Sequence, residues 1–197
     1  KGATSLTPWI HLNSTRSIAA TNKIHFSGAN GFPVAGYESF LNLLSPHFNI
    51  SAMDSRGAWP ERHSPPKGFS MHSFADDLIN GISQQNEHAV IGMGHSHGGQ
   101  STMIAALKRP ELFSKLILIE SASLPNPYID LIYRRLPKSV LFKLFPFMRG
   151  SEMRKKVWPS RQAFLDRYRK HSTFKRFTDQ ALNDYAQHGL FERDDSN

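Results

Sequence analysis

The stretch His88–Lys108 reads HAVIGMGHSHGGQSTMIAALK, and it decides the fold class of this chain. Its first part, Ala89–Met93, is short and apolar, which predicts a buried strand. Its last part, Gln100–Leu107, has the residue types of an α-helix, and Arg109-Pro110 ends it. Between the two parts stands Ser96, with one glycine two positions before it and another two positions after it.

The position of this serine indicates a reactive hydroxyl. Glycines lack a Cβ, so they relieve crowding where a strand turns sharply into a helix. The serine oxygen is then lifted clear of the backbone, at a helix N-terminus whose dipole favours negative charge. A G-x-S-x-G between a strand and a helix is the nucleophile-elbow signature. Taken alone, the five residues fit an ordinary glycine-rich turn equally well, so the surrounding sequence has to decide.

Strands and helices are predicted to alternate through the first two thirds of the chain. This alternation favours an α/β fold with a mostly parallel sheet and flanking helices. Arg56–Pro66 is polar and contains prolines, which predicts a surface loop. The predicted strands are Lys23–Ser27, Phe48–Met53, Ala89–Met93 and Leu116–Ile119, and the predicted helices are Tyr37–Leu44, Ser73–Ile82 and Gln100–Leu107.

Four chemically notable positions follow predicted strands. They are the loop that begins at Gly28, Asp54, Ser96 and Glu120. Ligands of such sheets bind at the carboxyl ends of the strands, so we expect these positions to converge. The strand Leu116–Ile119 is continuously apolar, which is typical of a parallel strand covered on both faces.

Composition limits the possible environments and partners. The 197 residues include no cysteine, which excludes disulfides and favours a reducing, cytoplasmic location. The net charge of +8 comes mostly from residues 134–176, and a solvated helical face explains it better than a nucleic-acid surface. No apolar stretch approaches the roughly 20 residues that span a membrane. Lys1–Ser5 do not resemble a secretory signal, although a trimmed leader stays open.

The domain organisation is expected to have three parts. Residues 1–124 form the N-terminal part of the core, residues 125–190 a helical cap or lid, and residues 191–197 the start of a return to the core. The cap segment is rich in basic residues and in aromatic ones. The aromatic side chains either cover an apolar acyl or aromatic group of the substrate or form the core of the cap itself; they are Phe142, Phe145, Phe147, Trp158 and Phe164.

In this order, the motifs resemble the α/β-hydrolase fold family. The strand and loop Ile24–Pro33 look like the family's oxyanion loop, particularly in members with an A-N-G-F-P sequence there. Asp54-x-Arg56-Gly57 is similar to the D-x-R-G after the next strand, and Gly94–Gly99 is similar to the elbow. Arg109–Glu120 resembles the helix end and the strand that follows it. The resemblance covers nearly the whole chain.

The resemblance implies a serine hydrolase. Ser96 would form an acyl-enzyme, which divides one difficult hydrolysis into two easier steps. The backbone N–H of His97 would be one oxyanion-hole donor, and the N–H of Ala29 or Asn30 the second. Glu120 stands where some relatives carry the acid of the triad, although an ordinary strand-end carboxylate is the alternative. The resemblance implies no cofactor and no metal, since His95 and His97 would need a third ligand.

Two departures from the family pattern are visible. Ser27-Gly28 replaces the usual His-Gly at the start of the loop, and backbone N–H groups do the work there. No good candidate exists for the catalytic histidine. His95 and His97 are expected to point away from the serine oxygen, and His171 and His188 fall in the predicted cap. We therefore expect the histidine in a C-terminal segment beyond these 197 residues, so that this stretch alone would be inactive.

The expected function is hydrolysis of an ester or related acyl bond in a small-molecule substrate with an apolar acyl group. The alternative is a non-catalytic ligand-binding protein on the same scaffold. A dehalogenase or an epoxide hydrolase of this fold would need an aspartate in the place of Ser96. The expected partners include neither nucleic acid nor a membrane span, but they include a C-terminal remainder of the same protein.

Overall fold

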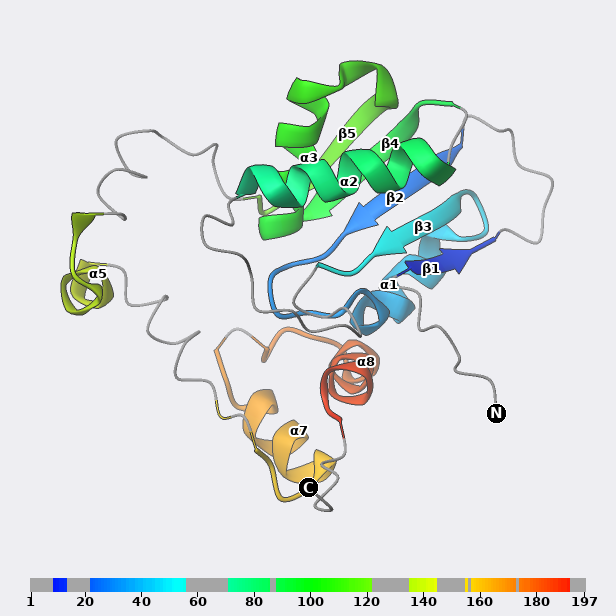
Figure 1. Cartoon of the computed structure of the whole chain (residues 1–197). Coiled ribbons are helices and arrows are strands. Elements are labelled where there is room, and N and C mark those ends of the chain that lie inside the picture. Colours follow the sequence, from blue (N-terminus) through cyan, green and yellow to red (C-terminus); the bar gives the residue numbers. More distant parts are fainter. Residues whose placement is uncertain are drawn as a thin grey trace, which may run out of the picture.

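The computed structural model describes residues 9–13, 22–55, 71–85, 88–121, 135–144, 155, 157–172 and 174–191 (Figure 1). Its centre is a five-stranded sheet with the order β1-β3-β2-β4-β5. Four strands are parallel, and β1 pairs antiparallel with β3 at one edge. The strands are β1 (Trp9–Leu12), β2 (Lys23–Ser27), β3 (Asn49–Met53), β4 (Val90–His95) and β5 (Phe113–Ile119).

The strand order contains a switch point between β2 and β4. From β2 the chain goes to β3 on one side, and it then returns to β4 on the other side. Ile24 of β2 lies opposite Ile50 of β3 and Ile91 of β4. Loops that leave neighbouring strands in opposite directions open a crevice at the carboxyl edge, where ligands of this architecture bind. The loop after β2 and the turn after β4 are those two loops.

Helices cover both faces of the sheet. The 3₁₀ helix η1 (Val34–Tyr37) and α1 (Glu38–Leu44) pack on one face, and α2 (Met71–Gln85) and α3 (His97–Lys108) pack together on the other. A short 3₁₀ turn, η3 (Pro110–Leu112), leads from α3 into β5. Successive strand side chains point to opposite faces. Ala52 accordingly packs in the cluster with Leu41 of α1, and Met53 packs in the cluster with Leu78 of α2.

The remaining described helices are α5 (Lys138–Leu144), α7 (Arg161–Arg169) and α8 (Asp179–Gly189). No strand occurs among the described residues from 135 to 191. Side-chain oxygens of Ser160 and Thr178 accept N–H bonds at the starts of α7 and α8. In Figure 1, α8 lies directly beside α1, and it contacts both α1 and η1.

All four predicted strands and all three predicted helices are present, with shifted ends. The elbow helix begins at His97 rather than Gln100, and the helix predicted from Tyr37 is preceded by η1. The strand β1 was not predicted, because four residues carry too little alternation to be recognised. The predicted loop 56–66 lies outside the described residues, as do residues 192–197 of the predicted return to the core.

The prediction that the last strand is covered on both faces is wrong for the described residues. Leu116, Ile117 and Leu118 of β5 are each about 40% exposed. Among the described strands, β5 pairs only with β4, so it is an edge strand here. Periodicity alone could not reveal this, because an apolar run does not say what covers it.

No described helix is both long enough and apolar enough to cross a membrane.

Asp184 of α8 fastens this helix to α1. One carboxylate oxygen accepts the backbone N–H of Ser39 at 2.9 Å, and the other accepts the side chain of Gln180 at 2.9 Å. The side chain is only 5% exposed. Burial acts to raise the pKa of Asp184, but the hydrogen bonds from Ser39 and Gln180 outweigh it and lower the pKa below its usual value.

We predict that Asp184→Ala lowers the free energy of unfolding by about 1–3 kcal/mol at neutral pH. A lowered folded-state pKa stabilises the fold above the usual aspartate pKa, and this contribution is lost as the pH falls through the lowered value. The difference between wild type and variant in urea denaturation should therefore shrink in acid. Asp166→Ala on the exposed face of α7 is the control and should stay within about 0.5 kcal/mol of wild type. Equal effects of both changes would contradict the anchoring role.

Candidate active site

Ser96 adopts a backbone conformation that few side chains tolerate. Its φ is 53° and its ψ is −117°, at the point where β4 ends and α3 begins. Its N–H donates to the carbonyl of Ile119 in β5 at 3.0 Å, and its carbonyl accepts the N–H of Gln100 at 3.1 Å. A non-glycine residue with positive φ costs about 1–3 kcal/mol and persists only where its surroundings enforce it. The turn at Ser96 is therefore held by one hydrogen bond to β5 and by another to the first turn of α3.

The two glycines of the motif are required by backbone contacts. A Cβ on Gly94 would lie 2.5 Å from the Cα of Gly99. A Cβ on Gly98 would lie 2.2 Å from the carbonyl oxygen of Ser27 and 2.5 Å from that of Gly28. These neighbours are main-chain atoms, which cannot turn aside as a flexible side chain can. The start of α3 is thus pressed directly against the end of β2.

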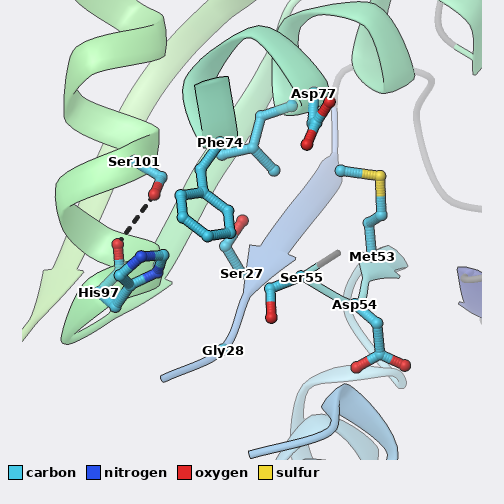
Figure 2. A pocket seen from close by; sticks show the side chains of 11 residues that line it. Ser27, Gly28, Met53, Asp54, Ser55, Phe74, Asp77, His97 and Ser101 are labelled. Atoms are coloured by element: carbon cyan, nitrogen blue, oxygen red, sulfur yellow. Dashed lines mark hydrogen bonds between the residues drawn. The ribbon is translucent and has the colours of Figure 1, made fainter. Parts of the chain in front are cut away.

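His97 is the first residue of α3, so its N–H lies in the first turn, where helix N–H groups have no intrahelical acceptor. Its side chain packs edge-to-face against Phe74 of α2, with ring centroids 4.4 Å apart (Figure 2). Burial lowers the pKa of His97. The hydroxyl of Ser101 donates to the carbonyl of His97 at 3.0 Å. The contact with Phe74 therefore holds the ring of His97 against α2, and the bond from Ser101 holds its main chain.

The loop after β2 is tied down at several points. The N–H of Ala29 donates to the hydroxyl of Tyr37 at 3.0 Å, and the N–H of Phe32 donates to the carbonyl of Ala29 at 3.1 Å. The N–H of Val34 donates to the Asp54 carboxylate, at the end of β3, at 2.7 Å. Burial raises the pKa of Asp54, partly offset by the bond from Val34 and by the charge of His188. Of the two predicted loop donors, Ala29 is therefore engaged, while Asn30 is exposed.

His95 and Glu120 flank the elbow. The Nδ1 atom of His95 lies 2.8 Å from the Tyr37 hydroxyl. Burial lowers the pKa of His95, and the negative charge of Glu120 opposes this shift. Glu120 is exposed, has a φ of 41°, and directly follows the carbonyl that binds the Ser96 N–H. The predicted serine and the predicted acid are thus brought to neighbouring strand ends.

An open pocket lies beside the elbow, between the ends of β2 and β3 and the helices α2 and α3 (Figure 2). The hydroxyl of Ser27, which takes the place of the family's usual histidine, is buried there without a hydrogen-bond partner among the described residues. The described lining residues are Ser27, Gly28, Met53, Asp54, Ser55, Phe74, Asp77, Leu78, His97, Gly98 and Ser101.

Three further histidines have partners other than the Ser96 hydroxyl. His25 is fully buried beside Ser51, and burial, together with the charge of His11, lowers its pKa to about 4. His171 packs against Phe174, and His188 lies 3.4 Å from Glu38. In the part of the chain that the structure describes, no histidine is hydrogen-bonded to Ser96.

The described aromatic side chains of the segment predicted as a cap pack in one cluster, and Phe32 of the loop after β2 packs against it. Trp158 and Phe164 pack with Tyr168, Phe174 and Tyr185, and Phe164 is only 4% exposed. Trp158 and Phe164 therefore pack among side chains of their own segment, in line with the second of the two explanations, while the role of this segment as a cap stays a prediction. Phe145 and Phe147 lie outside the described residues, as does the side chain of Phe142.

Two contacts in the site were missed by sequence reasoning. Phe32, from the A-N-G-F-P segment, stacks on Tyr185 of α8 with ring centroids 4.3 Å apart. The hydroxyl of Tyr37 reaches the loop and β4 at once. Neither contact has a local sequence signal, because the partners are separated by 153 residues in one case (185 minus 32) and by 58 in the other.

A family model described as the alpha/beta hydrolase fold matches residues 28–193. This chain therefore belongs to the α/β-hydrolase fold family.

Several relatives carry enzyme names. Ethanol acetyltransferase 1 of Cyberlindnera jadinii is 32% identical over 98 residues, which cover 50% of this chain and 29% of the relative. The protein named "Putative carbamate hydrolase RutD" of Agrobacterium fabrum is 30% identical over 113 residues, which cover 57% of this chain and 43% of the relative. The chain thus spans less than half the length of these curated relatives. Relatives in this family include hydrolases and acetyltransferases.

Solved structures share the fold. The hydrolase of E-2-(acetamidomethylene)succinate has a TM-score of 0.63 at 19% identity, over 87% of this chain and 57% of that one. The thioesterase domain from the curacin biosynthetic pathway also has a TM-score of 0.63, at 16% identity, over 91% of this chain and 62% of that one. At these identities the likeness concerns the fold alone.

We predict that Gly98→Ala lowers the free energy of unfolding by about 3 kcal/mol or more, because its methyl group would overlap two carbonyl oxygens that cannot move independently. Gly189→Ala at the end of α8 is the matched control. Its Cβ would meet the Tyr185 ring at an ordinary 3.5 Å, so stability should be unchanged or slightly higher. Thermal and urea denaturation measure both. A mild effect at Gly98 would mean that β2 and α3 are not in main-chain contact.

Proposed function

We propose that this chain carries the acyl-transfer centre of a serine hydrolase, in which Ser96 attacks an ester or a related acyl bond of a small molecule. The observation that carries the proposal is the strained backbone of Ser96, with a φ of 53°, at the switch point of a parallel sheet. Strain of this kind is concentrated at functional sites. A turn that served only to connect β4 with α3 would not need a serine there.

In the proposed reaction, the oxygen of Ser96 bonds to the acyl carbon while a base takes the hydroxyl proton. The carbonyl oxygen of the substrate becomes an oxyanion, which accepts hydrogen bonds from the backbone N–H groups of His97 and Asn30. Asn30 is preferred to Ala29 because the N–H of Ala29 already donates to Tyr37. Collapse of the intermediate breaks the bond to the leaving group, which takes the proton. Water then attacks the acyl-enzyme, releases the acid and regenerates Ser96.

An alcohol in place of water is a second candidate acceptor. Ethanol acetyltransferase 1 of Cyberlindnera jadinii and the carbamate hydrolase relative differ, by their names, in what receives the group. Both outcomes use the same serine, oxyanion site and acyl-enzyme in this proposal. The acceptor is then decided by which molecule reaches the acyl-enzyme first. We take water as the leading candidate, and the experiment below measures both products.

We further propose that the base lies outside the described residues, in a C-terminal part of the protein. Two observations support this. In the part of the chain that the structure describes, no histidine is hydrogen-bonded to Ser96, and Leu116, Ile117 and Leu118 of β5 are each about 40% exposed. A further stretch of chain would both cover β5 and supply the histidine. Glu120, beside the elbow, is our candidate for the acid that orients this histidine, with a plain strand-end carboxylate as the alternative.

Residues 125–190 are proposed to act as the cap of this site. Among the described residues, α8 packs on η1 and α1, and its Tyr185 stacks on Phe32 of the loop after β2. A cap in contact with that loop can influence which substrates reach Ser96. Because Trp158 and Phe164 are committed to the core of the cap, they no longer support an apolar acyl pocket.

We predict that a fluorophosphonate probe labels Ser96 in the full-length protein, and that Ser96→Ala abolishes labelling and p-nitrophenyl acetate turnover. Ser45→Ala is the control, because Ser45 lies in a turn after α1 and bonds only locally. When ethanol is added to the p-nitrophenyl acetate assay, a hydrolase should still produce acetate, whereas an acetyltransferase should produce ethyl acetate. Absence of labelling in a folded full-length protein would favour the alternative, a non-catalytic ligand-binding protein.

We predict that the fluorophosphonate probe labels Ser96 at the wild-type rate in the His171→Asn and His188→Asn variants. A base that lies outside the described residues does not depend on His171 or on His188. Rates of fluorophosphonate labelling measure this in the full-length protein, with Ser96→Ala as the inactive reference. Loss of labelling in one variant that keeps its wild-type melting temperature would place the base in the cap and overturn this part of the proposal.

A further inference from the structure

The hydroxyl of Tyr37 connects the two loops that form the candidate site. It accepts the N–H of Ala29 at 3.0 Å, in the loop after β2, and it lies 2.8 Å from Nδ1 of His95, the last residue of β4. His95 directly precedes Ser96. One side chain thus joins the segment with the proposed loop donor to the segment with the proposed nucleophile.

The directions of the two hydrogen bonds follow from proton counting. A backbone N–H can only donate, so the Tyr37 oxygen accepts from Ala29. The hydroxyl proton is then free to donate to Nδ1 of His95. The reverse bond, from a protonated Nδ1, would leave the hydroxyl proton without an acceptor among the described residues and is the poorer arrangement. His95 is therefore assigned the tautomer that carries its proton on Nε2.

The ring of Tyr37 holds the hydroxyl in place. It packs edge-on against Phe26 of β2, with ring centroids 4.8 Å apart, and edge-on against His95 at 5.9 Å. It also fills the space beside Gly28, where a Cβ would lie 3.0 Å from the ring. Burial raises the pKa of Tyr37 to about 12, partly offset by the bond from Ala29, so the phenol stays protonated near neutral pH and can donate.

We infer that Tyr37 is a positioning residue, whose hydroxyl holds the loop after β2 in register with the elbow and thereby sets the distance between the Asn30 N–H and the Ser96 oxygen. This inference rests on the proposed function. It also explains why Ala29 is not the free donor. The N–H of Ala29 is used to orient its own peptide, and the next N–H along the chain is left to face the substrate. Nothing in the reaction passes through Tyr37 itself.

The test is Tyr37→Phe in the full-length protein, which keeps the ring packing and removes the hydroxyl. The amide of Ala29 should then exchange with deuterium at least about tenfold faster, because its acceptor is gone. Fluorophosphonate labelling of Ser96 should slow by about 10- to 100-fold, the effect of small misplacement of a catalytic group. With p-nitrophenyl acetate the loss should fall on kcat, with KM nearly unchanged. Tyr168→Phe, the same change within the core of the cap, should leave all three measurements at their wild-type values.

A second pair of variants tests the other end of the connection. His95→Asn offers an amide oxygen as acceptor for the Tyr37 hydroxyl and should retain most of the labelling rate. His95→Leu removes the acceptor and should reproduce the effect of Tyr37→Phe. The ¹⁵N shifts of the His95 ring report the tautomer and should change in Tyr37→Phe. A purely structural role of Tyr37 would not produce this difference between Asn and Leu.

The outcomes separate the inference from the proposed function. Wild-type protein that does not react with the probe overturns the proposed function. Wild-type protein that reacts, together with Tyr37→Phe that reacts equally fast, overturns the inference and leaves the proposed function intact. Faster exchange of Ala29 together with slower labelling supports the inference. Equal labelling of His95→Asn and His95→Leu overturns it.

Discussion

The structure depends on the main-chain contact between the end of β2 and the first turn of α3. The carbonyl oxygens of Ser27 and Gly28 come so close to Gly98 that no side chain fits between them. This contact fixes where α3 can begin, so the chain must turn within one residue of the end of β4. The turn falls on Ser96 and gives it a φ of 53°. The strain of the serine and the closeness of the two loops are therefore two results of one steric constraint.

The same steric constraint also allows residues far away in the sequence to contact the loop after β2. Once the loop after β2 lies against α3, the N–H of its Ala29 can donate to Tyr37, and its Phe32 can stack on Tyr185 of α8. Asp54, at the end of β3, holds the following turn through Val34. The loop is thereby held by the sheet, by η1 and by α8 together. An oxyanion site works through donors that are in place before the reaction, and such multiple attachment would provide this order in the function that we propose.

Membership of the α/β-hydrolase fold family explains the scaffold but not the chemistry. Relatives of similar identity carry the names of an acetyltransferase and of a carbamate hydrolase. Strand order and the elbow are compatible with both, because the acyl-enzyme is common to them in our proposal. Differences between such enzymes lie in the loops and caps that control which molecules enter. In our proposal, the pocket beside His97 and the stacking of Tyr185 of α8 on Phe32 of the loop after β2 are the features of this chain that bear on specificity.

The sequence by itself determined the fold class, the four parallel strands and the position of the elbow, because apolar periodicity and the glycine spacing around Ser96 are local signals. It also indicated that the described cap segment is helical. Only the tertiary structure decided that Ala29 is engaged by Tyr37, that Trp158 and Phe164 pack in one cluster with Tyr185, and that β5 is exposed among the described residues. Each of these depends on which distant side chain occupies a given space. No local pattern encodes that choice, since it is made when the elements pack together.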